Sequence, residues 1–114
     1  MTRRSVICDR WDVVVVPFPF SDKAAEKRRP ALVLSSADFN SAGHTVLSMI
    51  TTRGHLPWPG DCNLEDHEDA GLPVPCLVRL KLFTLDNRVI LRRVGRLSDR
   101  DREKVESSLS THLP

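Results

Sequence analysis

A chain of 114 residues is long enough to bury one hydrophobic core, so we expect a single domain over residues 1–114. Hydrophobic residues make up 40% and charged residues 28%, which excludes an intrinsically disordered chain. No apolar run approaches the roughly 20 residues that span a bilayer. No apolar stretch that could form a signal peptide follows the N-terminal arginines. We therefore expect a cytoplasmic protein without a membrane segment.

The number of cysteines and the distribution of charge further limit the kinds of protein that this sequence can encode. An odd count of three cysteines argues against a disulfide framework. Residues 79–104 hold nine lysines and arginines against four carboxylates, whereas residues 61–69 hold five carboxylates and no lysine or arginine. This asymmetry predicts a positive face that can attract a polyanion, with the acidic segment lying elsewhere.

Five segments have the composition of β-strands. The first is Val13 to Val16 followed by "PFPF", where Pro17 and Pro19 cannot donate to a ladder. This strand must therefore end, bulge or lie at an edge there. In the segment 44–52, alternation places Leu47, Met49 and Thr51 on one face. The other strand segments are 31–36, 76–85 and, as one short strand or a pair of strands, 87–97.

Helical and irregular segments complete the pattern. Ser98 precedes a helix with acidic residues in its first turn and an apolar stripe of Val105, Leu109 and Leu113. Residues 37–43 predict a single helical turn. The proline- and glycine-rich residues 53–75 predict a long loop with at most one short strand. The pattern as a whole favours a mainly β fold, a small and partly closed antiparallel barrel with a C-terminal helix.

Two familiar kinds of catalytic site find no support in the sequence. Cys62, His67 and Cys76, with His55 nearby, lack the paired spacing that sets zinc ligands side by side. No G-x-S-x-G turn presents a nucleophilic serine. We therefore expect neither a metal nor another cofactor.

The "KRRPALVLSS" and "MITTRG" stretches suggest a phosphate site. Arg28 and Arg29 are compatible with a solvated turn, but Pro30 restricts Arg29 to an extended backbone that aims its side chain. A planar guanidinium can bind a phosphate through two parallel hydrogen bonds. Thr51 and Thr52 at a strand end are compatible either with exposed sheet threonines or with hydroxyls that donate to a phosphate oxygen.

These stretches, in order, resemble the MazF/PemK family of ribonuclease toxins from type II toxin–antitoxin modules. The resemblance runs from "DRWDVVVVPFPFSDKAAEKRRPALVLSS" through "VLSMITTRG" and "LVRLKLFTLDNRVI" to "VGRLSDRDREKVESSL". It implies an SH3-like, partly open barrel that acts as a homodimer. It also implies a sequence-specific endoribonuclease, or mRNA interferase, which cleaves single-stranded RNA without a metal ion.

The resemblance also assigns residues. The family's catalytic arginine directly precedes the proline, which is Arg29 here, and its catalytic threonine closes the following strand, which is Thr51. Thr52 takes that place if the register differs by one. We expect RNA-binding roles for Lys27, Arg28, Thr52 and Arg53. The attacking group is the RNA 2′-hydroxyl, which leaves a 2′,3′-cyclic phosphate and a 5′-hydroxyl, so the protein needs only to orient the strand and stabilise charge.

Partners and alternatives follow from the same resemblance. A cognate antitoxin would place an acidic tail over Arg28, Arg29 and Arg53. The sequence departs from the family at Trp11, where relatives commonly have glycine, and in the shorter 21–29 loop, which lacks their glycines. The alternatives are a non-catalytic toxin of the CcdB type that binds DNA gyrase, and a degenerate member that binds only RNA or its antitoxin. A gyrase binder has no need for the pairing of Arg–Pro with a strand-end threonine.

Overall fold

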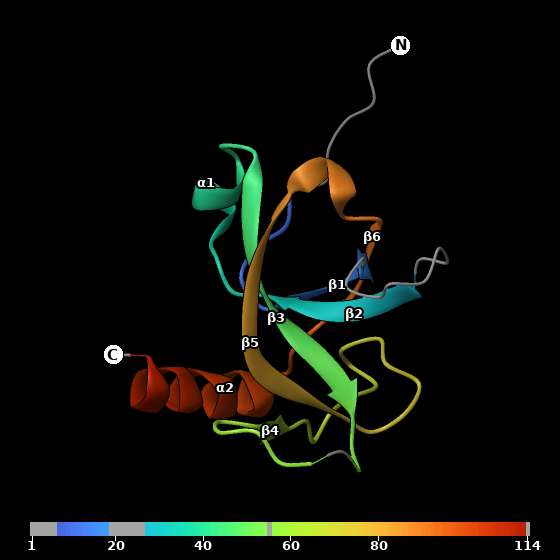
Figure 1. Cartoon of the computed structure of the whole chain (residues 1–114), viewed down its shortest axis with the longest axis vertical. Coiled ribbons are helices and arrows are strands. Elements are labelled where there is room, and N and C mark those ends of the chain that lie inside the picture. Colours follow the sequence, from blue (N-terminus) through green and yellow to red (C-terminus); the bar gives the residue numbers. More distant parts are fainter. Residues whose placement is uncertain (1–6, 19–26, 55, 114) are drawn as a thin grey trace.

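The structure is a computed structural model that describes residues 7–18, 27–54 and 56–113. Six antiparallel strands form one sheet in the order β4-β5-β3-β2-β1-β6, which curls into a half-barrel with a helix beside one end (Figure 1). This confirms the predicted mainly β, partly open barrel. The elements are β1 (Asp12–Phe18), β2 (Lys27–Val33), α1 (Ala37–Asn40), β3 (His44–Thr52), β4 (Cys62–Asn63), β5 (Cys76–Asp86), the 3-10 turn η1 (Asn87–Val89), β6 (Arg92–Arg96) and α2 (Asp99–His112).

β1 and β2 form a longer hairpin than the sequence predicts. β2 begins at Lys27 rather than at residue 31, because β1 continues through Pro17 and pairs as far as Phe18 opposite Lys27. On its other side β1 pairs with β6 only as far as Val15. Pro17 therefore lies where that side of the strand is unpaired, as its missing N–H requires. Pro19 lies outside the described residues.

The segment 87–97 contains one strand and not two. Its first residues form η1, and only β6 follows. The reason is Asn87, whose side chain is buried, donates to the Asn40 carbonyl at 2.7 Å and accepts from the Thr45 hydroxyl at 2.7 Å. These bonds hold the chain in a turn beside α1. The expected 37–43 turn is present as α1.

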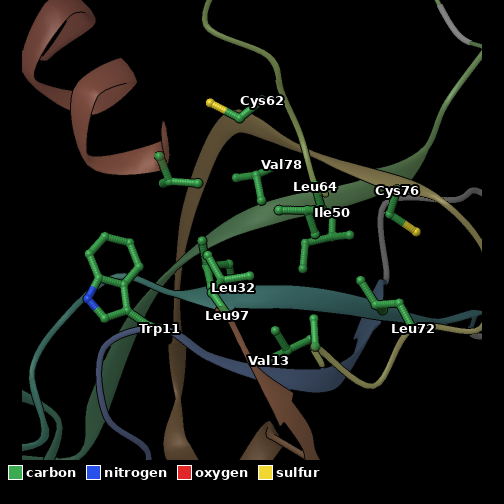
Figure 2. Packing of buried hydrophobic residues seen from close by; sticks show 12 residues of the cluster. Trp11, Val13, Leu32, Ile50, Cys62, Leu64, Leu72, Cys76, Val78 and Leu97 are labelled. Carbon is green, nitrogen blue, oxygen red and sulfur yellow. The ribbon is translucent and has the colours of Figure 1, made fainter. Parts of the chain in front are cut away.

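The sheet has a hydrophobic cluster on each face. One cluster includes Val105 of α2, and we call this side the α2 face; Figure 2 shows Val13, Leu32, Ile50 and Val78 from four strands pointing into it. The opposite side carries a second cluster, and we call it the Arg29 face because Arg29 alternates onto it. Residues of this second cluster are Cys8, Val14, Val16, Ala31, Val33, Leu47 and Ile90, with Met49, Phe83 and Leu85 packed against them.

α2 begins where the sequence predicts and holds part of the long loop. Ser98 caps its first turn, and its hydroxyl accepts from the Asp101 N–H. The buried Asp101 carboxylate accepts backbone N–H bonds from Glu65 and Asp66, each at 2.8 Å. The described residues of the predicted 53–75 loop therefore contain one short strand, β4, and the stretch around β4 lies beside α2 (Figure 1).

Within the part of the chain that the structure describes, no helix is both long and apolar enough to cross a membrane.

Candidate functional site

The register of β2 and β3 places Arg29 and Thr51 on the same face of the sheet. The described ladder between these strands ends with Ala31 opposite Met49. Continued by two residues in each strand, the same register sets Arg29 opposite Thr51. Because residues two apart in a strand share a face, both side chains belong to the Arg29 face. Arg29 and Thr51 are each half-buried.

The other threonine lies on the opposite side of the sheet. Thr52 alternates onto the α2 face and sits opposite Cys76 of β5. The next residue, Arg53, donates from Nη2 to the Leu64 carbonyl at 2.9 Å. Its guanidinium therefore ties the end of β3 to the long loop. Geometry thus favours Thr51 over Thr52 as the hydroxyl beside Arg29.

Lys27, Arg28 and Arg29 form a row of cations at the start of β2. Lys27 and Arg28 are exposed. None of the seven ion pairs among the described residues involves any of the three. An arginine or lysine without a carboxylate partner keeps its full charge for an external anion.

The predicted positive face at residues 79–104 is wrong. The acidic segment lies directly against it: Asp61 pairs with Arg79 at 2.9 Å, and Asp66 pairs with Arg100 at 2.6 Å. Hydrogen bonds from Arg100 and from the Ser98 hydroxyl hold the pKa of the Asp66 carboxyl well below its usual range. The cations and carboxylates that the sequence separates are therefore neighbours in the fold.

The remaining ion pairs extend this neutralisation to β6, to the end of β5 and to the first turns of α2. The buried Asp12 carboxylate lies 3.2 Å from Arg96 and 3.7 Å from Arg93. The other pairs are Arg88–Asp86, Arg102–Asp99 and Lys104–Glu65. Among the described cations, those outside any ion pair are Arg10, Lys27, Arg28, Arg29, Arg53, Lys81 and Arg92. Only in the row at the start of β2 are three of them consecutive.

The cysteines offer no nucleophile. Cys8, Cys62 and Cys76 are free and buried. Burial raises the pKa of the Cys8 thiol to about 11 and raises the pKa of the other two thiols as well. A buried thiol with a raised pKa stays protonated at neutral pH and does not react.

The sequence analysis did not single out Trp58, an exposed aromatic residue that lies beside Lys81 of β5. The Nζ atom of Lys81 lies 4.5 Å from the ring centre of Trp58. The sequence signal is the "LPWPGD" run at 56–61, in which two prolines flank the tryptophan before a Gly–Asp turn. Prolines on both sides restrict the backbone of that residue.

Comparison with known proteins identifies the fold and the family. The chain is similar to a chain of the MazE–MazF crystal structure (Form-III) from Deinococcus radiodurans, with 23% identity, TM-score 0.73, and coverage of 95% of this chain and 97% of that one. It is similar to an endoribonuclease in complex with its cognate antitoxin from Mycobacterial species, with 19% identity, TM-score 0.74 and coverage of 94% and 97%. It is also similar to MazF (Form-I) from Deinococcus radiodurans, with 25% identity, TM-score 0.71 and coverage of 95% and 97%.

A search of curated proteins finds no match. The family described as "PemK-like, MazF-like toxin of type II toxin-antitoxin system" matches residues 9–113. That match spans both faces of the sheet, the row of cations at the start of β2 and the end of β3. The chain therefore belongs to the PemK-like, MazF-like toxin family of type II toxin–antitoxin systems.

Proposed function

We propose that this toxin is a sequence-specific endoribonuclease that cleaves single-stranded RNA without a metal ion. The observation that supports this most directly is that Arg29 and Thr51 alternate onto one face of the sheet, just beyond the Ala31–Met49 pair where the ladder between β2 and β3 ends. The row Lys27–Arg29, which belongs to no ion pair among the described residues, supplies positive charge near these two side chains. One of the structural neighbours is itself named an endoribonuclease.

The chemistry needs few protein groups because RNA carries its own nucleophile. The 2′-oxygen attacks the adjacent phosphorus, the bond to the 5′-oxygen breaks, and a 2′,3′-cyclic phosphate and a 5′-hydroxyl result. Arg29 stabilises the extra negative charge that develops on the phosphorus oxygens. Thr51 donates its hydroxyl to a non-bridging oxygen. Lys27 and Arg28 attract and orient the phosphate backbone.

We further propose a cognate antitoxin, a homodimeric state and a cytoplasmic location. Three of the structural neighbours are MazE–MazF complexes, and another is bound to its cognate antitoxin. An acidic antitoxin segment would be complementary to Arg28 and Arg29, which form no ion pair with a carboxylate of the described residues. Arg53 would contribute its exposed charge at the neighbouring strand end, beside Thr52.

The test is cleavage of a long single-stranded RNA by the purified protein in excess EDTA, with the new ends mapped chemically. We expect discrete cuts that persist in EDTA and carry cyclic phosphates and 5′-hydroxyls. DNA of the same sequence should bind but stay intact, because it lacks the 2′-hydroxyl. Cleavage that EDTA abolishes would overturn the metal-independent mechanism. Complete absence of cleavage together with gyrase binding would favour a toxin of the CcdB type.

A further inference from the structure

The 56–61 segment, which follows β3, is a turn held rigidly over the edge of β5. The Asp61 carboxylate accepts from the Trp58 N–H at 3.0 Å, and the Asp61 N–H donates to the Trp58 carbonyl at 3.1 Å. Arg79 donates to both oxygens of Asp61 at 3.1 and 2.9 Å and to the Leu56 carbonyl at 2.8 Å. One arginine of β5 therefore holds both ends of the turn.

Gly60 and α2 fix the same turn from the other side of the sheet. Gly60 has φ +85°, and a Cβ there would lie 2.6 Å from Leu80 Cδ1. The Ser108 hydroxyl of α2 donates to the Gly60 carbonyl at 2.7 Å. The backbone at Gly60 is therefore pressed between β5 and α2, and the turn cannot shift without breaking these contacts.

The turn presents a tryptophan to solvent. Trp58 is 40% exposed, whereas Trp11, the other tryptophan, is 7% exposed and belongs to the core of the α2 face. Lys81 lies over the ring, which orients the indole and places a positive charge beside it. Leu56, at the start of the turn, is 87% exposed. A network of hydrogen bonds thus fixes the turn that carries this exposed aromatic ring.

This ring stands on the side of the sheet that carries the proposed site. Arg79 is opposite Met49 in the ladder, two residues from Thr51, and so lies on the Arg29 face. Lys81 lies in the bulge of β5, where the register to β3 shifts between Leu82 and Arg79. The residues on either side of it at a spacing of two, Arg79 and Phe83, belong to the Arg29 face. From strand spacings, the Cα atoms of Lys81 and Thr51 are on the order of 10–15 Å apart. A single strand bound at Thr51 can reach the ring within a few nucleotides.

We propose that Trp58, oriented by Lys81, is a stacking platform for an unpaired base of the RNA that flanks the cleaved phosphate. This inference rests on the proposed function, because it assigns a specificity element of the same substrate. A fixed aromatic ring with an adjacent cation is the combination that binds unpaired nucleotides: the base stacks on the ring, and the cation attracts the phosphate. Pro57 and Pro59 restrict the backbone on either side of Trp58, so less conformational entropy is lost when a base binds.

Binding is tested first, with a probe that cannot be cut. A mixed-sequence single-stranded oligodeoxyribonucleotide of ten bases, labelled for anisotropy, is titrated with the wild type, with Trp58→Leu and with Trp58→Tyr. We expect Trp58→Leu to weaken binding by about 5- to 100-fold, the usual effect of removing one stacking ring, and Trp58→Tyr to retain most of the affinity. The oligonucleotide should also quench the emission of Trp58 in the wild type but leave that of the buried Trp11 in Trp58→Tyr unchanged.

The matched control is Phe39→Leu, which removes an aromatic ring that is 52% exposed but lies on α1. It should bind and cut as the wild type does. On RNA, Trp58→Leu should raise KM with little change in kcat and should relax the preference at one base beside the cut. Circular dichroism and melting temperature establish that Trp58→Leu is folded.

The outcomes separate this inference from the proposed function. Weaker oligonucleotide binding by Trp58→Leu supports the platform even if the wild type cuts no RNA. Unchanged binding, KM and base preference in folded Trp58→Leu overturn it even if the wild type is an active nuclease. Loss of antitoxin binding with unchanged oligonucleotide binding would also overturn it, because Trp58 would then be a protein contact.

Discussion

Two regions of this molecule are rich in arginine and lysine, and they differ in what surrounds those residues. At the start of β2, Lys27, Arg28 and Arg29 take part in none of the ion pairs among the described residues. Between β5 and α2, the more numerous cations are matched by carboxylates, as in the pair Arg100–Asp66. The second region has the greater local excess of positive charge in the sequence, yet the first has the charge available to a ligand.

The difference teaches that a cluster of basic residues predicts a binding surface only once its internal partners are known. The 61–69 segment carries five carboxylates, and three of them, Asp61, Glu65 and Asp66, are used to neutralise β5 and α2. Exposed pairs of this kind contribute little stability individually. Their effect is to match these cations with carboxylates of the same chain.

The largest expected effect comes from making the same substitution in each region. Arg29→Ala should reduce the cleavage rate by about 100- to 1000-fold, the effect of removing one group that stabilises developing charge, and leave the melting temperature nearly unchanged. Arg100→Ala should do the opposite: it should lower the melting temperature by losing the bond to Asp66 and leave cleavage intact. Initial rates on a labelled RNA and thermal melts measure both.

A rate for Arg29→Ala within a few-fold of the wild type would show that the site is misassigned. Thr51→Val, which removes only the hydroxyl, provides a second check on the same site. Its matched control is Thr84→Val, an exposed strand threonine of β5. We expect slower cleavage from the first variant and unchanged cleavage from the second.

The next largest effect concerns the residue that holds the acidic segment in place. Asp101→Ala should lower the free energy of unfolding by about 2–3 kcal/mol, because two backbone N–H groups lose a buried charged acceptor. Chemical denaturation measures this. Asp99→Ala, two residues earlier and 93% exposed at its side chain, should have a much smaller effect. Equal losses for the two variants would show that Asp101 stabilises the fold through the helix dipole and not through its bonds to the backbone of Glu65 and Asp66.

The sequence predicts well where structure is local. Alternation in β3 gives its bounds and its faces, and Ser98 marks the start of α2, because both signals depend on a few adjacent residues. The likeness to known toxins pointed to Arg29 and Thr51 from short motifs. The register that places these two residues on one face comes from the pairing of β2 with β3, which sequence patterns alone do not fix.

Long-range contacts account for what the sequence could not show. The contacts between the acidic segment and α2 join residues more than thirty positions apart. Trp11 is a second case, since it has φ +78°, a region that strains any residue with a Cβ. A positive φ favours glycine, which the relatives commonly have at this position, yet this chain has a tryptophan there. Its indole is buried against the α2 face, which offsets that strain.

A smaller effect is expected in the salt dependence of oligonucleotide binding, which should change for variants at the start of β2 but not for a variant in α2. For a single-stranded oligodeoxyribonucleotide, the slope of log affinity against log salt should fall by about 0.7 for each phosphate contact removed. Lys27→Ala and Arg28→Ala should each show this reduction between about 50 and 200 mM salt. Lys104→Ala should keep the wild-type slope, because its ammonium is occupied by Glu65 and by the Asn63 carbonyl. A reduced slope for Lys104→Ala would place the bound strand along α2 instead.

The smallest effect is the acid sensitivity of the paired region. Arg100 and Ser98 lower the pKa of Asp66 in the folded protein, so the stabilisation is fully present above the unfolded-state pKa of about 4 and is lost as the pH falls below it. Asp66→Asn should therefore melt below the wild type at pH 6, and the difference should shrink as the pH approaches 2. Thermal melts across that range measure it.

Glu68→Gln is the matched control for this titration, because Glu68 is an exposed carboxylate of the same segment and belongs to none of the ion pairs among the described residues. It should follow the wild type at every pH. A constant gap between wild type and Asp66→Asn from pH 6 to pH 2 would contradict the prediction. It would mean that the Asp66 carboxylate acts through its shape and packing, and that neutralising charge is not what ties the acidic segment to α2.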